Sequence, residues 1–294
     1  MGRFLFCATL LLLSACSRAA PPPAPRAPSS SEEPPRLAIP RDLRASVERS
    51  VALGREIYLQ DKAGAIGTDA VLAKEKTLEG KGMGGFMALR EGDEAGRPLP
   101  GYVVLFYTRG PEFSVRYEVR VPLKVGARPS VESINPPRVV SGDLATFIRA
   151  RQTALEAAGP FDHAMNPVIL PDPDGGILVY LLTPATRRNT VVFGKHFRVS
   201  LTVEGKVKSV EPLSRGELEI STAAPAEAEK RALFVSHLVS SYPLETHVAA
   251  SLTADLPIYV VTSRGLWFVD HDDIAYVSEQ VPDEMGRVVS GIAN

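Results

Sequence analysis

The fold is decided by the stretch Phe113–Val121, which reads FSVRYEVRV. Apolar residues occupy every second position and alternate with serine, arginine and glutamate. Successive side chains of a β-strand point to opposite faces, so this alternation places all the apolar groups on one face. We therefore predict a strand with one buried and one solvent-facing side, as is typical of an antiparallel sheet.

A helix and two further strands precede this stretch. Apolar residues recur at helical spacing over Asp42–Gln60, and the helical pattern resumes at Asp69–Lys76. Phe86–Leu89 and Tyr102–Thr108 are expected to be strands. Residues 41–139 are therefore expected to form a first α+β unit, in which a helix packs on an antiparallel meander.

A second unit is expected from Ser141, a residue type that favours the first position of a helix. Gly159-Pro160 should end this helix. The apolar run Ile177–Leu182 predicts a central strand, and Phe197–Glu204 is a second alternating stretch. The turn Glu204-Gly205 should then lead into a strand over Val207–Leu213.

The last part of the chain is expected to repeat the order of helix and then strands. We predict a helix over Ala226–Ser240 and strands over His247–Leu252, Ile258–Thr262 and Leu266–Val269, with a turn at Arg264-Gly265. Residues 140–294 would then form a second α+β region with a third helix and C-terminal hairpins. The fold class is therefore α+β, with two or three helix-plus-antiparallel-meander units packed into one or two domains.

This pattern resembles small helix-on-sheet periplasmic modules, such as the PepSY-like and cystatin-like folds, and uncharacterised proteobacterial envelope proteins. The resemblance implies a fold of helices packed on antiparallel sheets. It implies no activity.

The N-terminus carries a positive residue, Arg3, before the apolar segment Phe4–Leu13 and the small residues Ser14-Ala15. Leu13-Ser14-Ala15-Cys16 resembles the lipobox of bacterial lipoproteins. The resemblance implies that residues 1–15 are a signal peptide, that cleavage falls between Ala15 and Cys16, and that the Cys16 thiol and amine are acylated and hold the protein to the bilayer. An ordinary secretory signal, cut between Ser17 and Ala20, is the alternative.

Residues 16–40 differ in composition from the rest. They contain eight prolines and few large apolar side chains, so they are expected to be a flexible tether with polyproline character. A proline-rich ligand for a partner domain is the alternative reading. Because no aspartate follows Cys16, the lipoprotein resemblance implies an outer-membrane location facing the periplasm, in a cell with two membranes.

Composition excludes several kinds of chemistry. The only two cysteines, Cys7 and Cys16, both lie in or next to the signal, so no thiol is left for a disulfide, a thiolate metal site or a cysteine nucleophile. The chain has 33 basic and 34 acidic residues, which gives no electrostatic basis for binding nucleic acid. No cofactor, metal or catalytic residue is assigned.

Two short motifs and one tryptophan each have a structural and a functional interpretation. Gly80–Gly85 matches G-x-G-x-x-G, but a charged segment precedes it and a strand follows it, so a loop is favoured over a dinucleotide site. Asp172–Gly176 resembles the start of a calcium loop, yet Thr183 stands where the loop needs glutamate, so a β-turn is favoured. Trp267 is expected in the core.

The residues Asp270-His271-Asp272-Asp273 are the candidate for catalysis or metal binding. If strand faces met, His196 and His247 could join them or form a two-imidazole site. Ser236 and His237, expected as neighbours on a helix, would point about 100° apart and form no catalytic dyad.

Two functional hypotheses follow. The first is a non-enzymatic envelope binding or assembly module that meets a periplasmic protein or cell-wall component, for example by adding a partner strand to a sheet edge. The alternative is a hydrolase or metal-dependent enzyme that uses Asp270–Asp273.

Overall fold

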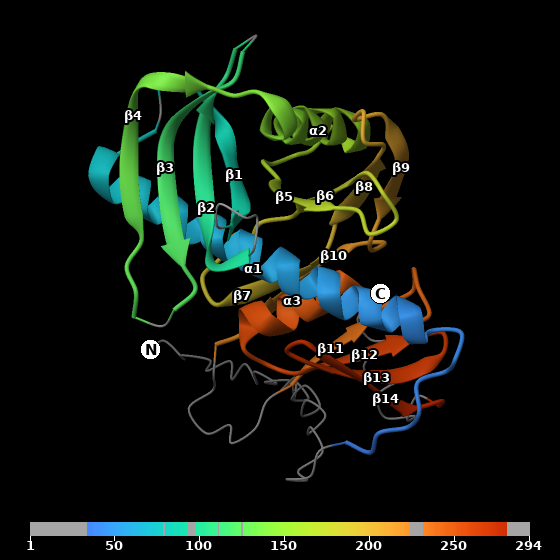
Figure 1. Cartoon of the computed structure of the whole chain (residues 1–294). Coiled ribbons are helices and arrows are strands. Elements are labelled where there is room, and N and C mark those ends of the chain that lie inside the picture. The colour runs from blue at the N-terminus through green and yellow to red at the C-terminus, as the bar shows by residue number, and fades with distance from the viewer. Residues whose placement is uncertain are drawn as a thin grey trace, which may run out of the picture.

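The computed structural model describes residues 34–280 apart from residues 79, 93–97, 111, 125 and 224–231. Three helices lie in this part of the chain: α1 (Arg44–Glu75), α2 (Gly142–Ala158) and α3 (Glu245–Ala254). α1 crosses the molecule between the sheets, as Figure 1 shows. In the described residues no helix has the length and apolar character needed to cross a bilayer.

Fourteen strands form three four-stranded sheets and one two-stranded ribbon in the described residues. The first sheet is a meander, in the order β1 (Met83–Gly92), β2 (Pro98–Thr108), β3 (Ser114–Pro122), β4 (Ser130–Val139). The second has the order β5 (Asn166–Pro171), β6 (Ile177–Leu182), β8 (Phe197–Leu201), β9 (Val207–Pro212). The third has the order β11 (Leu233–Ser236), β12 (Ile258–Thr262), β13 (Gly265–Asp270), β14 (Asp273–Ser278). The ribbon pairs β7 (Thr190–Gly194) with β10 (Glu217–Ser221).

The predicted α+β class is confirmed, and all pairings are antiparallel except that of β11 with β12. The stretch Phe113–Val121 buries its apolar face as expected, with Val115 and Val119 at 0% exposure. α3 connects the two parallel strands, which accounts for this one exception, because parallel neighbours need a crossover connection.

α1 is the structural centre of the molecule because its buried side chains contribute to three hydrophobic cores. Leu43 and Val47, on the turn before the helix and on its first turns, pack with the third sheet. Leu53 and Ile57 pack with the second sheet, and the C-terminal half of the helix packs with the first. The predicted boundary between residues 139 and 140 stays a prediction.

The expected interruption of the first helix between Gln60 and Asp69 is wrong, since α1 runs unbroken from Arg44 to Glu75. Glycines in this region weaken the helical pattern, each costing about 1 kcal/mol relative to alanine. They are needed for close packing: a Cβ on Gly67 would lie 3.0 Å from Val104 Cβ on β2. Likewise a Cβ on Gly54 would lie 2.5 Å from the Glu245 carbonyl oxygen on α3, so tertiary contacts outweigh the local propensity.

The second sheet is buried on both faces. One face packs against α2, and the other packs against α1 and the segment before α3. This explains the continuous apolar run of β6, which is the predicted central strand. α2 begins after Ser141 and ends before Gly159, as predicted. The Ser141 side chain, however, makes no capping hydrogen bond.

The expectations for the third unit are partly wrong. Residues 232–240 are not helical, because Leu233–Ser236 forms the strand β11; residues 226–231 lie outside the described residues. His247–Leu252 is not a strand but part of α3. β12, β13 and the turn at Arg264-Gly265 are confirmed, and Trp267 is fully buried in the core of the third sheet.

Candidate functional site

The predicted acylation residue Cys16 and the cleavage position after Ala15 lie outside the described residues. The Asp172–Gly176 motif is a turn, as favoured from the sequence, whereas only the first half of the Gly80–Gly85 motif lies in a loop. Gly80–Gly82 forms a turn before β1, which begins at Met83 rather than Phe86. Asp172–Gly176 is the turn between β5 and β6, closed by a hydrogen bond from the Gly175 N–H to the Asp172 carbonyl oxygen (2.9 Å).

The sequence Asp270–Asp273 forms the exposed hairpin turn between β13 and β14. His271 Nδ1 contacts Asp270 Oδ1 at 2.6 Å, and His271 Nε2 contacts Asp255 Oδ1 at 2.9 Å. The hydrogen bonds to Asp255 and then to Asp270 raise the pKa of His271, although 43% of its side chain is exposed. Asp272 and Asp273 instead form exposed ion pairs with arginines.

The structure does not bring this turn to His196 and His247. His271 contacts Asp255 at the C-terminal end of α3, whereas His247 lies in the first turn of that helix. Eight residues separate Asp255 from His247, which corresponds to about 12 Å along a helix. Within the described ranges, no three His, Cys, Asp or Glu residues are grouped to hold a metal ion. The Asp270–Asp273 turn therefore lacks the convergent groups that the enzyme hypothesis requires.

His196 and His247 do line one cavity, of about 210 Å³, together with His237. His237 follows β11 and His247 is helical, so the expected strand position of His247 and the expected helical position of Ser236-His237 are both wrong. The His237 and His247 rings meet edge to face with centroids 4.6 Å apart. Burial lowers the pKa of His196 and of His237 to about 4, and lowers that of His247 too.

Hydrogen bonds hold these imidazoles in defined neutral forms. His196 Nδ1 accepts from the Thr183 N–H (3.0 Å), so its Nε2 carries the proton and donates to the Val192 carbonyl (3.1 Å). His247 Nδ1 accepts from the Leu244 N–H (3.1 Å) and caps the start of α3. Neutral rings with these bonds stabilise the local backbone, and they provide no charge for catalysis near neutral pH.

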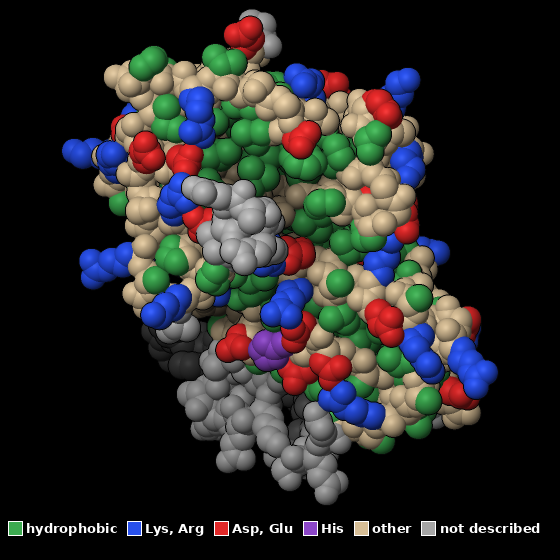
Figure 2. All heavy atoms as spheres, viewed as in Figure 1, with side chains coloured by type: hydrophobic (Ala, Val, Ile, Leu, Met, Phe, Trp, Pro, Cys, Tyr) green, Lys and Arg blue, Asp and Glu red, His purple; other side chains and the backbone are tan. Residues whose placement is uncertain are grey.

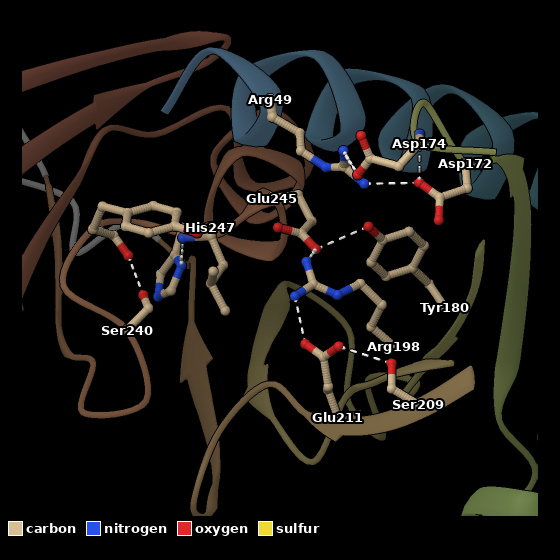
Figure 3. A network of polar contacts seen from close by, with 12 residues as sticks. Arg49, Asp172, Asp174, Tyr180, Arg198, Ser209, Glu211, Ser240, Glu245 and His247 are labelled. Atoms are coloured by element: carbon tan, nitrogen blue, oxygen red, sulfur yellow. Dashed lines mark hydrogen bonds and ion pairs between the residues drawn. The ribbon is translucent and has the colours of Figure 1, made fainter. Parts of the chain in front are cut away.

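A network of buried charges connects the second sheet to α3 (Figure 3). Tyr180, Arg198 and Glu211 stand side by side on β6, β8 and β9, since they are paired in register. Glu245 in α3 is only 1% exposed; it accepts hydrogen bonds from Tyr180 Oη (2.8 Å) and Arg198 Nη1 (2.6 Å). Arg198 Nη2 donates to Glu211 Oε2 (2.6 Å).

This network is built to hold α3 in place. Burial followed by the charge of Glu245 raises the pKa of Tyr180, so the phenol stays protonated and donates. Burial alone would lower the pKa of Arg198, but the charge of Glu245 and the hydrogen bond to Glu211 outweigh it and raise the pKa. Each charge is thus paired, which a buried ionic group requires.

The candidate binding site is a groove of about 1090 Å³. It lies between the N-terminal half of α1, the end of β1, α2 and the edge strand β5. Figure 2 shows hydrophobic side chains gathered on this face, where the first and second sheets meet. The apolar walls include Leu53, Leu89, Phe147 and Ile169, while small side chains such as Ala52 line the exposed side of α1.

Two ion pairs and one amide give the groove its polar groups. Arg49 Nη2 donates to Asp172 Oδ1 (2.9 Å), and Arg90 pairs with Glu56. The amide of Gln60, in contrast, makes no hydrogen bond to any described residue. Its residue is 8% exposed and lines the groove. The Gln60 amide is therefore free to bond to a ligand in the groove.

The sequence interpretation did not identify the groove residues or the buried network. Arg49, Glu56 and Gln60 were part of a predicted helix, and nothing in their spacing indicated which loop or strand they would meet. The turn Asp172–Gly176 was the one sequence signal near the groove. Its Asp172 side chain is 5% exposed and pairs with Arg49, so this turn also anchors α1.

Comparison of the chain with protein-family models, with curated proteins and with solved structures gave no match. The interpretation of the groove therefore depends on its own geometry and chemistry.

Proposed function

We propose that this chain is a lipid-anchored, non-enzymatic envelope protein that binds an extended polypeptide segment of another envelope protein in the α1–β5 groove. The observation that carries the binding role is the groove itself, about 1090 Å³ in volume and mostly apolar. Ligand sites in proteins are usually concave, largely apolar and supplied with a few polar groups that fix orientation.

The lipobox resemblance of Leu13–Cys16 supports the anchor, and the absence of an aspartate after Cys16 supports an outer-membrane location facing the periplasm. Two or more acyl chains hold a protein firmly to a bilayer, whereas one does not. Mass spectrometry of the native N-terminus tests this part of the proposal. We expect a first residue Cys16 that carries fatty acids, and an unacylated N-terminus or another first residue would contradict it.

An extended peptide fits the polar groups of the groove. The two formal positive charges, on Arg49 and Arg90, are paired with Asp172 and Glu56, so the walls offer no excess charge to attract an ionic ligand. The Gln60 amide has both donors and an acceptor, which match the N–H and C=O groups of a peptide bond. Apolar side chains of the segment would occupy the walls.

The edge strand β5 limits how the segment binds. Pro167 and Pro171 lie in β5 and have no N–H to donate to an added strand. Prolines on an edge strand hinder pairing with another chain. A continuous added strand on β5 is therefore disfavoured, and we infer that side-chain contacts and Gln60 hold the segment.

Site-specific photocrosslinking in cells that produce the full chain tests the groove. A photoreactive residue at Ala45, an exposed groove position, should crosslink to one defined segment of an envelope protein. Ala52→Trp fills the groove without removing a packed side chain and should abolish that crosslink. Ala73→Trp is the matched control, because Ala73 is exposed on the same helix outside the groove, and it should leave the crosslink unchanged.

Two results would contradict the peptide-binding proposal. One is a crosslink from Ala45 that persists in the Ala52→Trp variant. The other is crosslinking only to lipid, which would show that the apolar walls receive acyl chains.

A further inference from the structure

A second cavity, of about 140 Å³, lies where α1, α3 and β7 meet. It shares no lining residue with the α1–β5 groove. Its walls include Asp61 from α1, Asn166 at the start of β5 and Thr246 from α3. The cavity is therefore a separate place in the fold, and its chemistry has to be explained separately.

Asp61 is the only carboxylate that lines this cavity. Among the described residues no side chain or backbone group gives it a hydrogen bond or an ion pair, and its burial raises its pKa. Other buried carboxylates near α1 and α3 are paired, as Glu245 is with Arg198 and Asp172 is with Arg49. The Asp61 side chain is half-buried, and a carboxylate with no cation beside it favours the binding of one.

Two further half-buried polar side chains line the same cavity. The amide of Asn166 and the hydroxyl of Thr246 line the cavity and make no hydrogen bond within the part of the chain that the structure describes. The wall residue His196 cannot serve them, because its two ring nitrogens already bond to Thr183 and Val192. The cavity thus offers one negative charge and two neutral hydrogen-bonding groups that have no partner among the described residues.

We propose that this cavity binds a small primary ammonium compound that also carries a hydroxyl group. The carboxylate of Asp61 pairs with the ammonium, and Asn166 and Thr246 bond to the hydroxyl. A cavity of about 140 Å³ has room for about ten waters, since about 10–15 Å³ of such volume holds one. A short amino alcohol fits within this space.

Ethanolamine has the required groups and is the probe for the test. The full acylated chain in detergent is titrated with ethanolamine and with ethylene glycol, its uncharged counterpart, and binding is followed by calorimetry and by the shift in melting temperature. We expect ethanolamine to bind and to raise the melting temperature. Ethylene glycol should do neither, because it cannot pair with Asp61.

Asp61→Asn removes the charge with little change in shape and should weaken ethanolamine binding at least tenfold. Asp69→Asn is the matched control, since Asp69 is an exposed carboxylate on the same helix, and it should bind as the unmodified chain does. Removing a desolvated charge should leave Asp61→Asn folded, and its melting curve without ligand verifies this.

Three outcomes would overturn the proposal: no binding of ethanolamine to the unmodified chain, equal binding to the Asp61→Asn variant, or equal binding of ethylene glycol. Vesicles that contain phosphatidylethanolamine form a further arm. Competition by these vesicles would identify a lipid head group as the source of the amine, and its absence would identify a free amine. The groove variant Ala52→Trp should bind ethanolamine normally, which separates this test from that of the groove.

Discussion

The two ends of α3 hold charged groups at similar distances in opposite surroundings. At the N-terminal end, Arg198 lies 2.6 Å from Glu245, which is 1% exposed. At the C-terminal end, His271 lies 2.6 Å from Asp270 and 2.9 Å from Asp255, but 43% of the His271 side chain and 91% of that of Asp255 are exposed. The length of the bond therefore does not indicate how much each ion pair contributes to stability. Burial decides this contribution, because water screens the exposed pairs and leaves the buried pair unscreened.

The largest effect is expected from removing the buried partner. Glu245→Ala leaves the Arg198 guanidinium and the Tyr180 hydroxyl without their acceptor, so we expect a loss of about 3–5 kcal/mol in the free energy of unfolding. Glu211→Ala is the matched control, because Glu211 bonds to the same arginine with 44% of its side chain exposed, and it should cost about 1 kcal/mol or less. Urea unfolding of both variants measures the difference, and equal losses would refute the role of burial.

Acid should weaken the N-terminal end through its histidines. An unfolded histidine has a pKa of about 6.5, whereas burial lowers the pKa of His237 to about 4, so between these values the unfolded chain binds more protons. Stability is therefore complete above about pH 6.5 and is lost as the pH falls toward 4. One such histidine contributes about 3 kcal/mol to this loss.

His237→Gln tests this dependence. His237 Nε2 donates to Ser240 Oγ (2.9 Å), because the single Ser240 proton is given to the Tyr242 carbonyl, and the glutamine amide can keep this donor. The variant should lose less stability between pH 6.5 and 4 than the unmodified chain does. An unchanged acid slope in urea unfolding would mean that His237 does not titrate in this range.

The difference between the two ends also explains what the sequence could predict of the site. Asp270–Asp273 stands out in the sequence because its charged residues are consecutive. These residues form a hairpin with a two-residue turn, and an exposed turn can carry consecutive charges without any functional role. Glu245 lies 65 residues from Tyr180 and 47 from Arg198. The strand register brings Tyr180 and Arg198 together, and the packing of α3 brings Glu245 to them. No spacing rule along one chain identifies such a set.

For the fold, segments with a regular apolar pattern were predicted well, whereas the helix α3, whose buried positions are partly polar, was not. β3 and α2 each have one apolar side and could be recognised by its period. α3 packs against α1, β7 and β13, and its buried positions include Glu245, His247 and Ser251, so no apolar stripe marks it as a helix. The segment before β11 is rich in alanine, glutamate and lysine, whose helix propensity led to the wrong expectation for residues 232–240.

An intermediate effect is expected at Arg49, which pairs with two aspartates of different exposure. The Asp172 side chain is 5% exposed and that of Asp174 is 72% exposed. Asp172→Ala should cost about 1–3 kcal/mol, because it leaves Arg49 Nη2 and the Asp174 N–H without their acceptor. Asp174→Ala should cost about 0.5 kcal/mol or less. Thermal unfolding ranks the two, and the reverse order would show that distance outweighs burial here.

The smallest effect, with the opposite dependence on pH, is expected at the C-terminal end. Hydrogen bonds to Asp255 and Asp270 raise the pKa of His271, so its contribution is complete below the unfolded pKa and is lost as the pH rises through the folded value. His271→Asn suits the test, because His271 has a φ of 56° and asparagine tolerates this left-handed conformation. The variant should be less stable by about 1 kcal/mol or less near pH 5 and indistinguishable at alkaline pH. The buried histidines are present in the unmodified chain and in the variant, so their effect cancels when the two free energies of unfolding are subtracted. If this difference grew as the pH rose, the exposed ion pairs would not stabilise this end of α3.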